Sequence, residues 1–202
     1  MMEAIFFDYG GVIVHPSQKH ACQLEEKYGL PEGALWRALY ESPEWQALQL
    51  GGATEADWIE AASRELDVIG APGPEILKEE STIWRDLDET MLDLVHRLRQ
   101  RYRVGMISNA KPWLEAELRD VHKIDHLFEV VVNSASVGMR KPDPRIFRHA
   151  ARILDLTPTV CVHIDDVMEN IRGAEETGFH AIHYQGHLPS LVSELQRLGL
   201  RW

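Results

Sequence analysis

The stretch AIFFDYGG, residues 4–11, decides the fold of this 202-residue chain. Its first four residues are apolar and do not alternate with polar ones, which is typical of a strand buried on both faces of a parallel sheet. The run ends at Asp8, and Gly10 and Gly11 follow. Because ligands of open α/β sheets bind at the carboxyl ends of the strands, Asp8 is a candidate site residue.

Three more apolar runs end in polar residues, and a fifth run is weaker. The runs are 104–107 before Ser108 and Asn109, 130–132 before Asn133 and Ser134, 160–164 before Asp165 and Asp166, and 180–184. Amphipathic helical patterns separate them at 88–101, 144–155 and 167–177. This alternation of strands and helices predicts an α/β fold built on a doubly wound parallel sheet.

The segment 16–87 interrupts this alternation with helical patterns alone. We expect helices at 17–29, 32–41, 54–67 and 74–85, separated by proline and glycine. The segment is therefore predicted to form a helical cap domain inserted into a core made of 1–15 and 88–202. Four of the six tryptophans, Trp36, Trp45, Trp58 and Trp84, lie in it. We expect them to form mainly the core of the cap.

Composition narrows the classes of function. The formal net charge is −11, from 21 basic and 32 acidic residues, and such a field repels nucleic acids and anionic membranes. The two cysteines, Cys22 and Cys161, lack zinc-site spacing and fit a reducing compartment. The amino-terminal residues do not read as a signal peptide, and no apolar run approaches the ~18 residues of a membrane span. The expected location is the cytoplasm.

The polar strand ends are expected to converge on one site. Asp8, Asp165 and Asp166 would meet at one edge of the sheet, together with Lys141 from the loop after the third strand. Carboxylates packed that closely repel one another unless a cation compensates. A hard cation with oxygen ligands, most simply Mg²⁺, suits such a donor set.

Four motifs in order resemble those of the haloacid dehalogenase (HAD) superfamily, in the subgroup with a helical cap. They are DYGGV at 8–12, Ser108-Asn109, KPDP at 141–144 and IDD at 164–166. The resemblance covers essentially the whole chain. It is strongest to glucose-1-phosphate phosphatases and to the amino-terminal phosphatase domain of soluble epoxide hydrolases. It implies a HAD-like Rossmannoid core and a magnesium-dependent phosphatase acting on a small phosphorylated metabolite such as a sugar phosphate.

The resemblance also implies roles for individual residues. Asp8 would be the nucleophile that forms an aspartyl-phosphate. The Mg²⁺ ligands would be Asp8, the carbonyl of Gly10 and Asp166. Lys141 would neutralise charge on the phosphoryl group.

The remaining implied site residues assist these groups. Ser108 and the backbone N–H groups at Asn109 would bind phosphate oxygens, near a helix expected to begin around Pro112. Asp165 would orient Lys141 or a metal-bound water.

Gly10 departs from the superfamily pattern, because phosphatases of this kind usually carry a second aspartate there as the general acid and base. Loss of such a group costs about 10²–10⁴-fold in rate. Two alternatives therefore stay open: a haloacid dehalogenase, which fits less well because its aromatic residue is absent at Gly10, and a non-catalytic protein that binds a phosphate or metabolite. The sequence leaves the oligomeric state and the role of His15 undetermined. His122 and His126 have zinc-site spacing but no evident third ligand.

Overall fold

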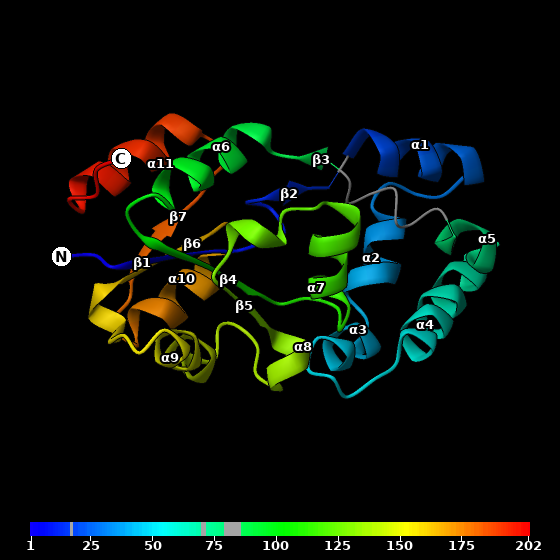
Figure 1. The fold of residues 1–202 in the computed structure, drawn as a ribbon. Coiled ribbons are helices and arrows are strands. Elements are labelled where there is room, and N and C mark those ends of the chain that lie inside the picture. Colours follow the sequence, from blue (N-terminus) through cyan, green and yellow to red (C-terminus); the bar gives the residue numbers. More distant parts are fainter. Residues whose placement is uncertain (17, 70–71, 79–85) are drawn as a thin grey trace.

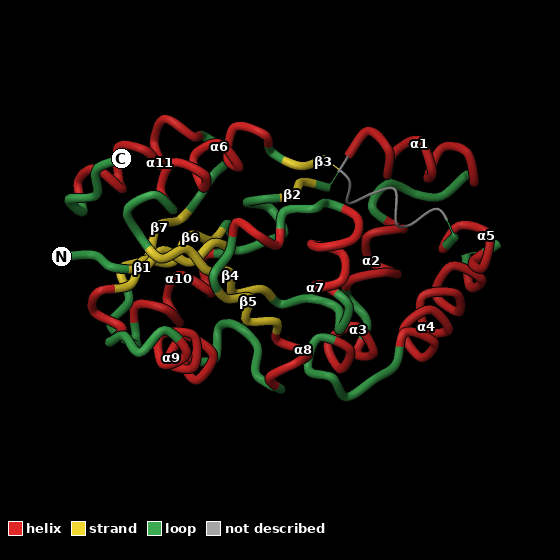
Figure 2. The backbone as a smooth tube through the Cα atoms, viewed as in Figure 1, coloured by secondary structure: helices red, strands yellow, loops and turns green. Residues whose placement is uncertain are grey.

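A five-stranded parallel sheet forms the centre of the protein (Figures 1 and 2). The computed structural model describes residues 1–16, 18–69, 72–78 and 86–202. The strand order is β5-β4-β1-β6-β7, so the order reverses at β1. The strands are β1 (Ala4–Phe7), β4 (Arg103–Ser108), β5 (Val130–Asn133), β6 (Cys161–Asp165) and β7 (His180–His183). All five match the apolar runs, and the predicted doubly wound fold is confirmed.

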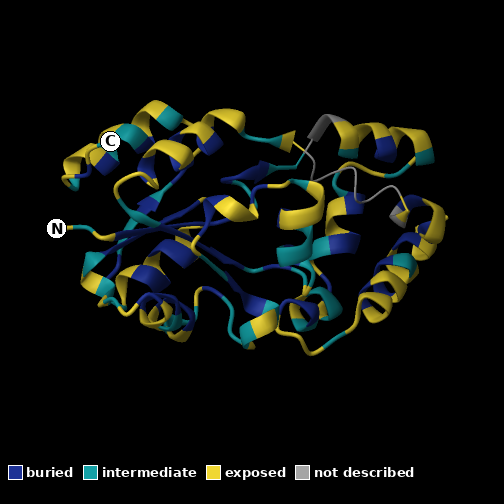
Figure 3. Ribbon diagram, viewed as in Figure 1, coloured by how far each residue is buried: buried dark blue, intermediate teal, exposed yellow. Residues whose placement is uncertain are grey.

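Helices cover both faces of this sheet, and alternate residues of β1 point into the two layers. Ile5 and Phe7 pack against α6 (Glu89–Leu98) and α11 (Leu188–Arg197). On the other face, Ala4 and Phe6 pack against α9 (Pro144–Ile153) and α10 (Met168–Glu175). All four β1 residues are fully buried, and Figure 3 shows the sheet as the most buried part of the ribbon.

Capping residues set where two of these helices begin. Asp88 caps α6 by accepting hydrogen bonds from two backbone N–H groups, and Asp143 caps α9 by accepting one from Arg145. Pro144 follows as the first residue of α9, where its missing N–H and fixed φ favour helix initiation. The observed start of α9 at Pro144 agrees with the helical pattern predicted from residue 144.

Between β2 and β3, the described residues form helices that pack together as a separate group, the helical unit. They are α1 (Gln18–Tyr28), α2 (Ala34–Tyr40), α3 (Pro43–Leu48), α4 (Glu55–Val68) and α5 (Gly73–Leu77). Their core contains Leu35, Leu48 and Trp58. The sequence patterns missed α3, because Pro43 reads as a helix breaker but here occupies the first helical position behind the capping Ser42. Part of the helix expected at 74–85 lies outside the described residues. Trp84 also lies outside them.

A short ribbon carries the chain into and out of the helical unit. The strands β2 (Val14–His15) and β3 (Asp86–Leu87) pair antiparallel, with Val14 opposite Leu87. Ribbons of two residues per strand are too short for a period-2 pattern to reveal. Within the described part of the chain, no helix is long and apolar enough to cross a membrane.

Candidate active site

A buried lysine links two aspartates at the carboxyl edge of the sheet. Because Phe7 pairs with Ile164 in the parallel ladder, Asp8 and Asp165 leave neighbouring strands side by side. The Nζ atom of Lys141 lies 2.9 Å from Oδ1 of Asp8 and 2.6 Å from Oδ2 of Asp165. Lys141 is 1% exposed. A fully buried cation held by two carboxylates is what the sequence motifs predict for this edge.

Asn109 fixes the backbone of Lys141. Its side-chain oxygen accepts a hydrogen bond from the Lys141 N–H at 2.8 Å, and its Nδ2 donates to the Lys141 carbonyl at 2.9 Å. The helical unit reaches the same loop, because Nε2 of Gln49 donates to the Asn109 carbonyl at 3.0 Å. The side chain of Asn109 therefore positions Lys141, while its backbone lines the cavity described below.

Asp165 is the most heavily hydrogen-bonded carboxylate of the site. Besides Lys141, it accepts hydrogen bonds from Nδ2 of Asn170, from the backbone N–H of Val167 and, at 3.0 Å, from Nε2 of His163. Burial would raise the pKa of Asp165, but Lys141 and His163 overcome this and hold the pKa well below its usual range. Burial lowers the pKa of the His163 ring, so we describe it as neutral. Sequence reasoning did not single out His163, because a histidine inside an apolar strand gives no such signal.

Three carboxylates lie close enough to share one cation. Oxygen atoms of Asp8, Asp165 and Asp166 all lie within 4.8 Å of one another. Burial raises the pKa of Asp8 to about 7 against the opposing charge of Lys141, and Asp165 and Asp166 contribute to the rise. Burial and Asp165 likewise raise the pKa of Asp166. Such mutual repulsion among oxygen donors is what Mg²⁺ relieves, so the donor set fits this ion.

The loop after β1 leaves room for Asp166 only because it carries a glycine. Gly11 has φ +77°, and a Cβ atom there would lie 2.2 Å from Oδ2 of Asp166. Gly10 precedes it and forms an isolated bridge with Val14. The close approach of this loop to Asp166 is consistent with the predicted contribution of the Gly10 carbonyl to the same site.

Ser108 ends β4 and is 3% exposed. The loop that follows is held by Ser134, whose Oγ accepts from the Ala110 N–H at 3.1 Å. The helix expected near Pro112 begins later. It is α7 (Leu114–Ala116), which continues into a π-helical turn, Glu117–Val121. The two together form one continuous helical stretch over residues 114–121, so its amino-terminal end lies close to the expected position.

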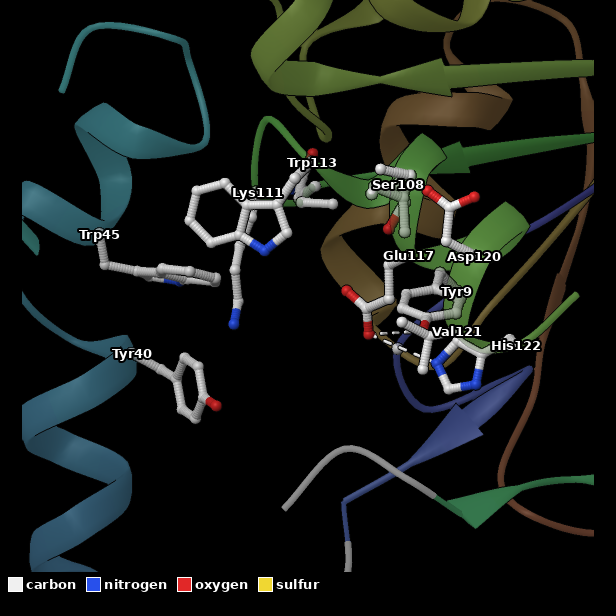
Figure 4. A pocket seen from close by; sticks show the side chains of 15 residues that line it. Tyr9, Tyr40, Trp45, Ser108, Lys111, Trp113, Glu117, Asp120, Val121 and His122 are labelled. Carbon is white, nitrogen blue, oxygen red and sulfur yellow. Dashed lines mark hydrogen bonds and ion pairs between the residues drawn. The ribbon is translucent and has the colours of Figure 1, made fainter. Parts of the chain in front are cut away.

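A cavity of about 550 Å³ adjoins these loops (Figure 4). Tyr9, Gly10, Ser108 and Asn109 line it on the side of the aspartates. Tyr40 and Trp45 of the helical unit line the other side, together with Trp113 of the core. The expectation that the cap tryptophans form a core holds for Trp58, which is 2% exposed, whereas Trp45 also faces the cavity. It is wrong for Trp36, which is 41% exposed.

A second polar group lies in the same cavity. Glu117 accepts a hydrogen bond from the Tyr9 hydroxyl at 3.2 Å and lies 3.4 Å from Nε2 of His122. This contact accounts for His122 without a metal. His15 lies on the ribbon, with Nε2 3.4 Å from Oδ2 of Asp88. Sequence reasoning missed Glu117 because only the fold brings it to Tyr9.

Comparison with known proteins identifies the family. The haloacid dehalogenase-like hydrolase family matches residues 2–178, so the chain belongs to this family and is a HAD-like hydrolase. It is 26% identical to a sesquiterpene phosphatase of Aspergillus oryzae, over 98% of this chain and 97% of that one. It is 27% identical to a D-ribitol-5-phosphate phosphatase of Bacteroides thetaiotaomicron, over 89% and 90% of the two chains.

A solved structure shows the same fold. It is a HAD family enzyme of Bacteroides thetaiotaomicron, crystallised as the wild-type protein with magnesium and inorganic phosphate. The match has a TM-score of 0.73 at 20% identity and covers 93% of this chain and 96% of that one. The resemblance noted from the motifs is thus confirmed at the level of family and fold.

Proposed function

We propose that the protein is a magnesium-dependent phosphatase that hydrolyses a small phosphate monoester through an aspartyl-phosphate on Asp8. The observation that carries the proposal is the buried Lys141 between Asp8 and Asp165, next to Asp166. Tyr9 and Gly10, which follow Asp8 in the chain, line the adjoining cavity. The phosphatases among the relatives and the magnesium–phosphate complex of the structural relative support the same reading.

The chain's own residues account for the first half of the reaction. An Asp8 oxygen attacks phosphorus, the bond from phosphorus to the alcohol oxygen breaks, and the alcohol leaves. Lys141 holds Asp8 at Oδ1 and stabilises negative charge as it develops on the phosphoryl oxygens. Ser108 and backbone N–H groups at Asn109 hold the phosphoryl group. Water then hydrolyses the aspartyl-phosphate and releases inorganic phosphate.

Asp8, Asp166 and the Gly10 carbonyl would hold the Mg²⁺ ion. When bound, the ion supplies positive charge that offsets the carboxylates and the phosphoryl oxygens. Asp165 keeps Lys141 in place through its 2.6 Å contact. We further propose that the helical unit, residues 16–87, acts as a cap that excludes water, because Gln49 and Trp45 reach the Asn109 loop and the cavity.

Gly10 provides no side chain to protonate the leaving alcohol. The alcohol oxygen must therefore take its proton from water or from the substrate, and slow turnover of unactivated esters is the expected consequence. The missing side chain at Gly10 favours one competing function, the binding of phosphate without hydrolysis.

Phosphate release from p-nitrophenyl phosphate tests the proposal, because this leaving group needs little protonation. The assay compares Mg²⁺ with EDTA, and wild type with Asp8→Asn. Asp67→Asn, an exposed position on α4, is the matched control. We expect release that needs Mg²⁺, is lost in Asp8→Asn and is retained in Asp67→Asn. Release that persists in Asp8→Asn contradicts the nucleophile, and complete inactivity of a protein that binds Mg²⁺ favours the binding function.

A further inference from the structure

The cavity beside the aspartates is much larger than a phosphoryl group requires. Its volume of about 550 Å³ lies within the range of about 300–1,000 Å³ typical of sites for small organic molecules. Ser108 lies on one side, and the aromatic side chains of Tyr40 and Trp45 lie on the other, with Trp113 beside them (Figure 4). If the phosphoryl group binds at Asp8, the group attached to it extends toward these rings.

The aromatic wall is held in place by neighbouring rings. Trp45 lies between Tyr40 and Trp58, with ring centroids 5.1 Å and 5.4 Å away. Trp58 in turn is buried and donates its indole N–H to the Leu39 carbonyl at 2.6 Å. Trp113 lies outside the helical unit in the chain but packs against the buried cluster of that unit. A rigid apolar surface of this kind loses little conformational freedom when it binds a hydrocarbon group.

Several polar side chains that line the cavity already have partners, and Asp120 pairs with Arg119. Glu117 interacts with Tyr9 and His122, and Asn109 uses both atoms of its amide on the backbone of Lys141. A leaving group rich in hydroxyls would have to replace these contacts or bury its own hydroxyls without partners, and both alternatives cost free energy.

The lysine in the cavity faces aromatic rings. This lysine is Lys111, and its Nζ atom lies 4.8 Å from the ring centroid of Trp58 and 5.6 Å from that of Trp113. Cation–π contacts of this length stabilise the ammonium against the ring faces. Beyond it, the apolar side chains of Leu114 and Val121 continue the lining, and Val121 is 67% exposed.

From these observations we infer that the leaving group of the substrate is an apolar, carbon-rich alcohol, of isoprenoid or aryl type, and that Trp45 and Trp113 select it. This inference rests on the proposed phosphatase function. It distinguishes the substrate from the sugar phosphates that the resemblance of the motifs implies, and equally from polyol phosphates. Hydrolysis needs only water as co-reactant and releases the apolar alcohol and inorganic phosphate.

Relative kcat/KM values for four phosphates, measured with Mg²⁺, test the inference. Geranyl phosphate and ribitol 5-phosphate compare an apolar with a hydroxylated alkyl alcohol, and 1-naphthyl phosphate tests the aryl type. Acetyl phosphate, with its small acyl group, measures turnover independently of the aromatic wall. A single methylene in an apolar pocket changes kcat/KM by about 10–200-fold, so we expect geranyl phosphate to exceed ribitol 5-phosphate by about 100-fold or more. If kcat/KM for 1-naphthyl phosphate exceeds that for geranyl phosphate, the leaving group is assigned to the aryl type.

Variants of the two tryptophans then test the wall itself. Trp113→Leu and Trp45→Leu should each lower the ratio of geranyl phosphate to acetyl phosphate activity by about tenfold. Val68→Ala, at an exposed position of the helical unit, should change neither activity. Acetyl phosphate turnover reports whether each variant is folded, and two variants are used so that the failure of one to fold does not remove the test.

The outcomes distinguish the two proposals. Equal or faster hydrolysis of ribitol 5-phosphate, or an unchanged activity ratio in a folded tryptophan variant, overturns the inference and leaves the phosphatase function standing. If none of the four phosphates is hydrolysed, the proposed function fails, and the inference fails with it.

Discussion

Lys141→Met is the substitution whose consequence follows most directly from the geometry of the site. The side chain is fully buried, and its Nζ atom neutralises Asp8 at 2.9 Å and Asp165 at 2.6 Å. Methionine fills a similar volume without charge and leaves two buried carboxylates facing each other. Removing one partner of a buried ion pair costs about 3–5 kcal/mol of unfolding free energy. For a chain of this length, that corresponds to a fall of about 6–20 °C in Tm.

The loss of stability should depend on pH. Burial by itself would raise the pKa of both Asp8 and Asp165, and Lys141 is the main group that opposes this effect. In wild type, the depressed pKa of Asp165 contributes stability that is present above about pH 4 and lost as the pH falls. Wild type gains stability from the protonation of Asp8 alone, whose pKa is about 7. In Lys141→Met the folded-state pKa values of both carboxyls should be raised, so the variant gains more stability than wild type as they protonate. The difference in unfolding free energy between wild type and Lys141→Met therefore becomes smaller as the pH falls from 7.5 to 5.

Urea unfolding followed by tryptophan fluorescence, in EDTA at both pH values, measures this gap. Lys27→Met, at an exposed position of α1, is the control and should stay within about 0.5 kcal/mol of wild type. A loss below about 1 kcal/mol at pH 7.5, or a gap of equal size at both pH values, would refute the reasoning, because it would mean that the carboxylates do not depend on Lys141 for compensation.

Two further substitutions test the loop after β1 and the helix that follows Lys141. Gly11→Ala should lower Mg²⁺-dependent kcat/KM by about tenfold or more, because its Cβ atom would displace Asp166. Gly186→Ala is the matched control: its φ is also positive, but nothing lies near its Cβ, so it should cost about 1–2 kcal/mol of stability and leave kcat/KM unchanged. Equal effects on kcat/KM would show that backbone strain, and not the clash, is responsible. Asp143→Ala removes the cap of α9 and should lower the unfolding free energy by about 1 kcal/mol in urea titration. An unchanged urea midpoint would mean that Asp143, as the N-cap of α9, contributes nothing to the unfolding free energy.

The sheet and its order of elements were predictable because their signals are local. Each buried strand is a short apolar run, and each run ends where a polar side chain appears, as at Asp8 and Asp165. The cap of α9 is also a local signal. The motifs placed Lys141 near these aspartates through resemblance to a family, and the structure brings the three side chains together. Their catalytic roles stay predictions.

The short elements were not predictable, because they lack enough residues for a periodic pattern. The ribbon of β2 and β3 has two residues per strand, and α3 begins at a proline that reads as a breaker. The helix expected near Pro112 begins at Leu114, and no pattern in the sequence indicated that it changes into a π-helical turn at Glu117.

The sequence by itself therefore determined the parallel sheet and the carboxylates at its edge, because apolar runs and charge are properties of neighbouring residues. Only the tertiary structure decided what surrounds them. Glu117 reaches the Tyr9 hydroxyl because the fold brings together two segments that lie 108 residues apart in the chain. Trp45 and Trp113 face one cavity because the helical unit packs against the core. Contacts between segments so far apart in the chain depend on packing, which no local pattern records.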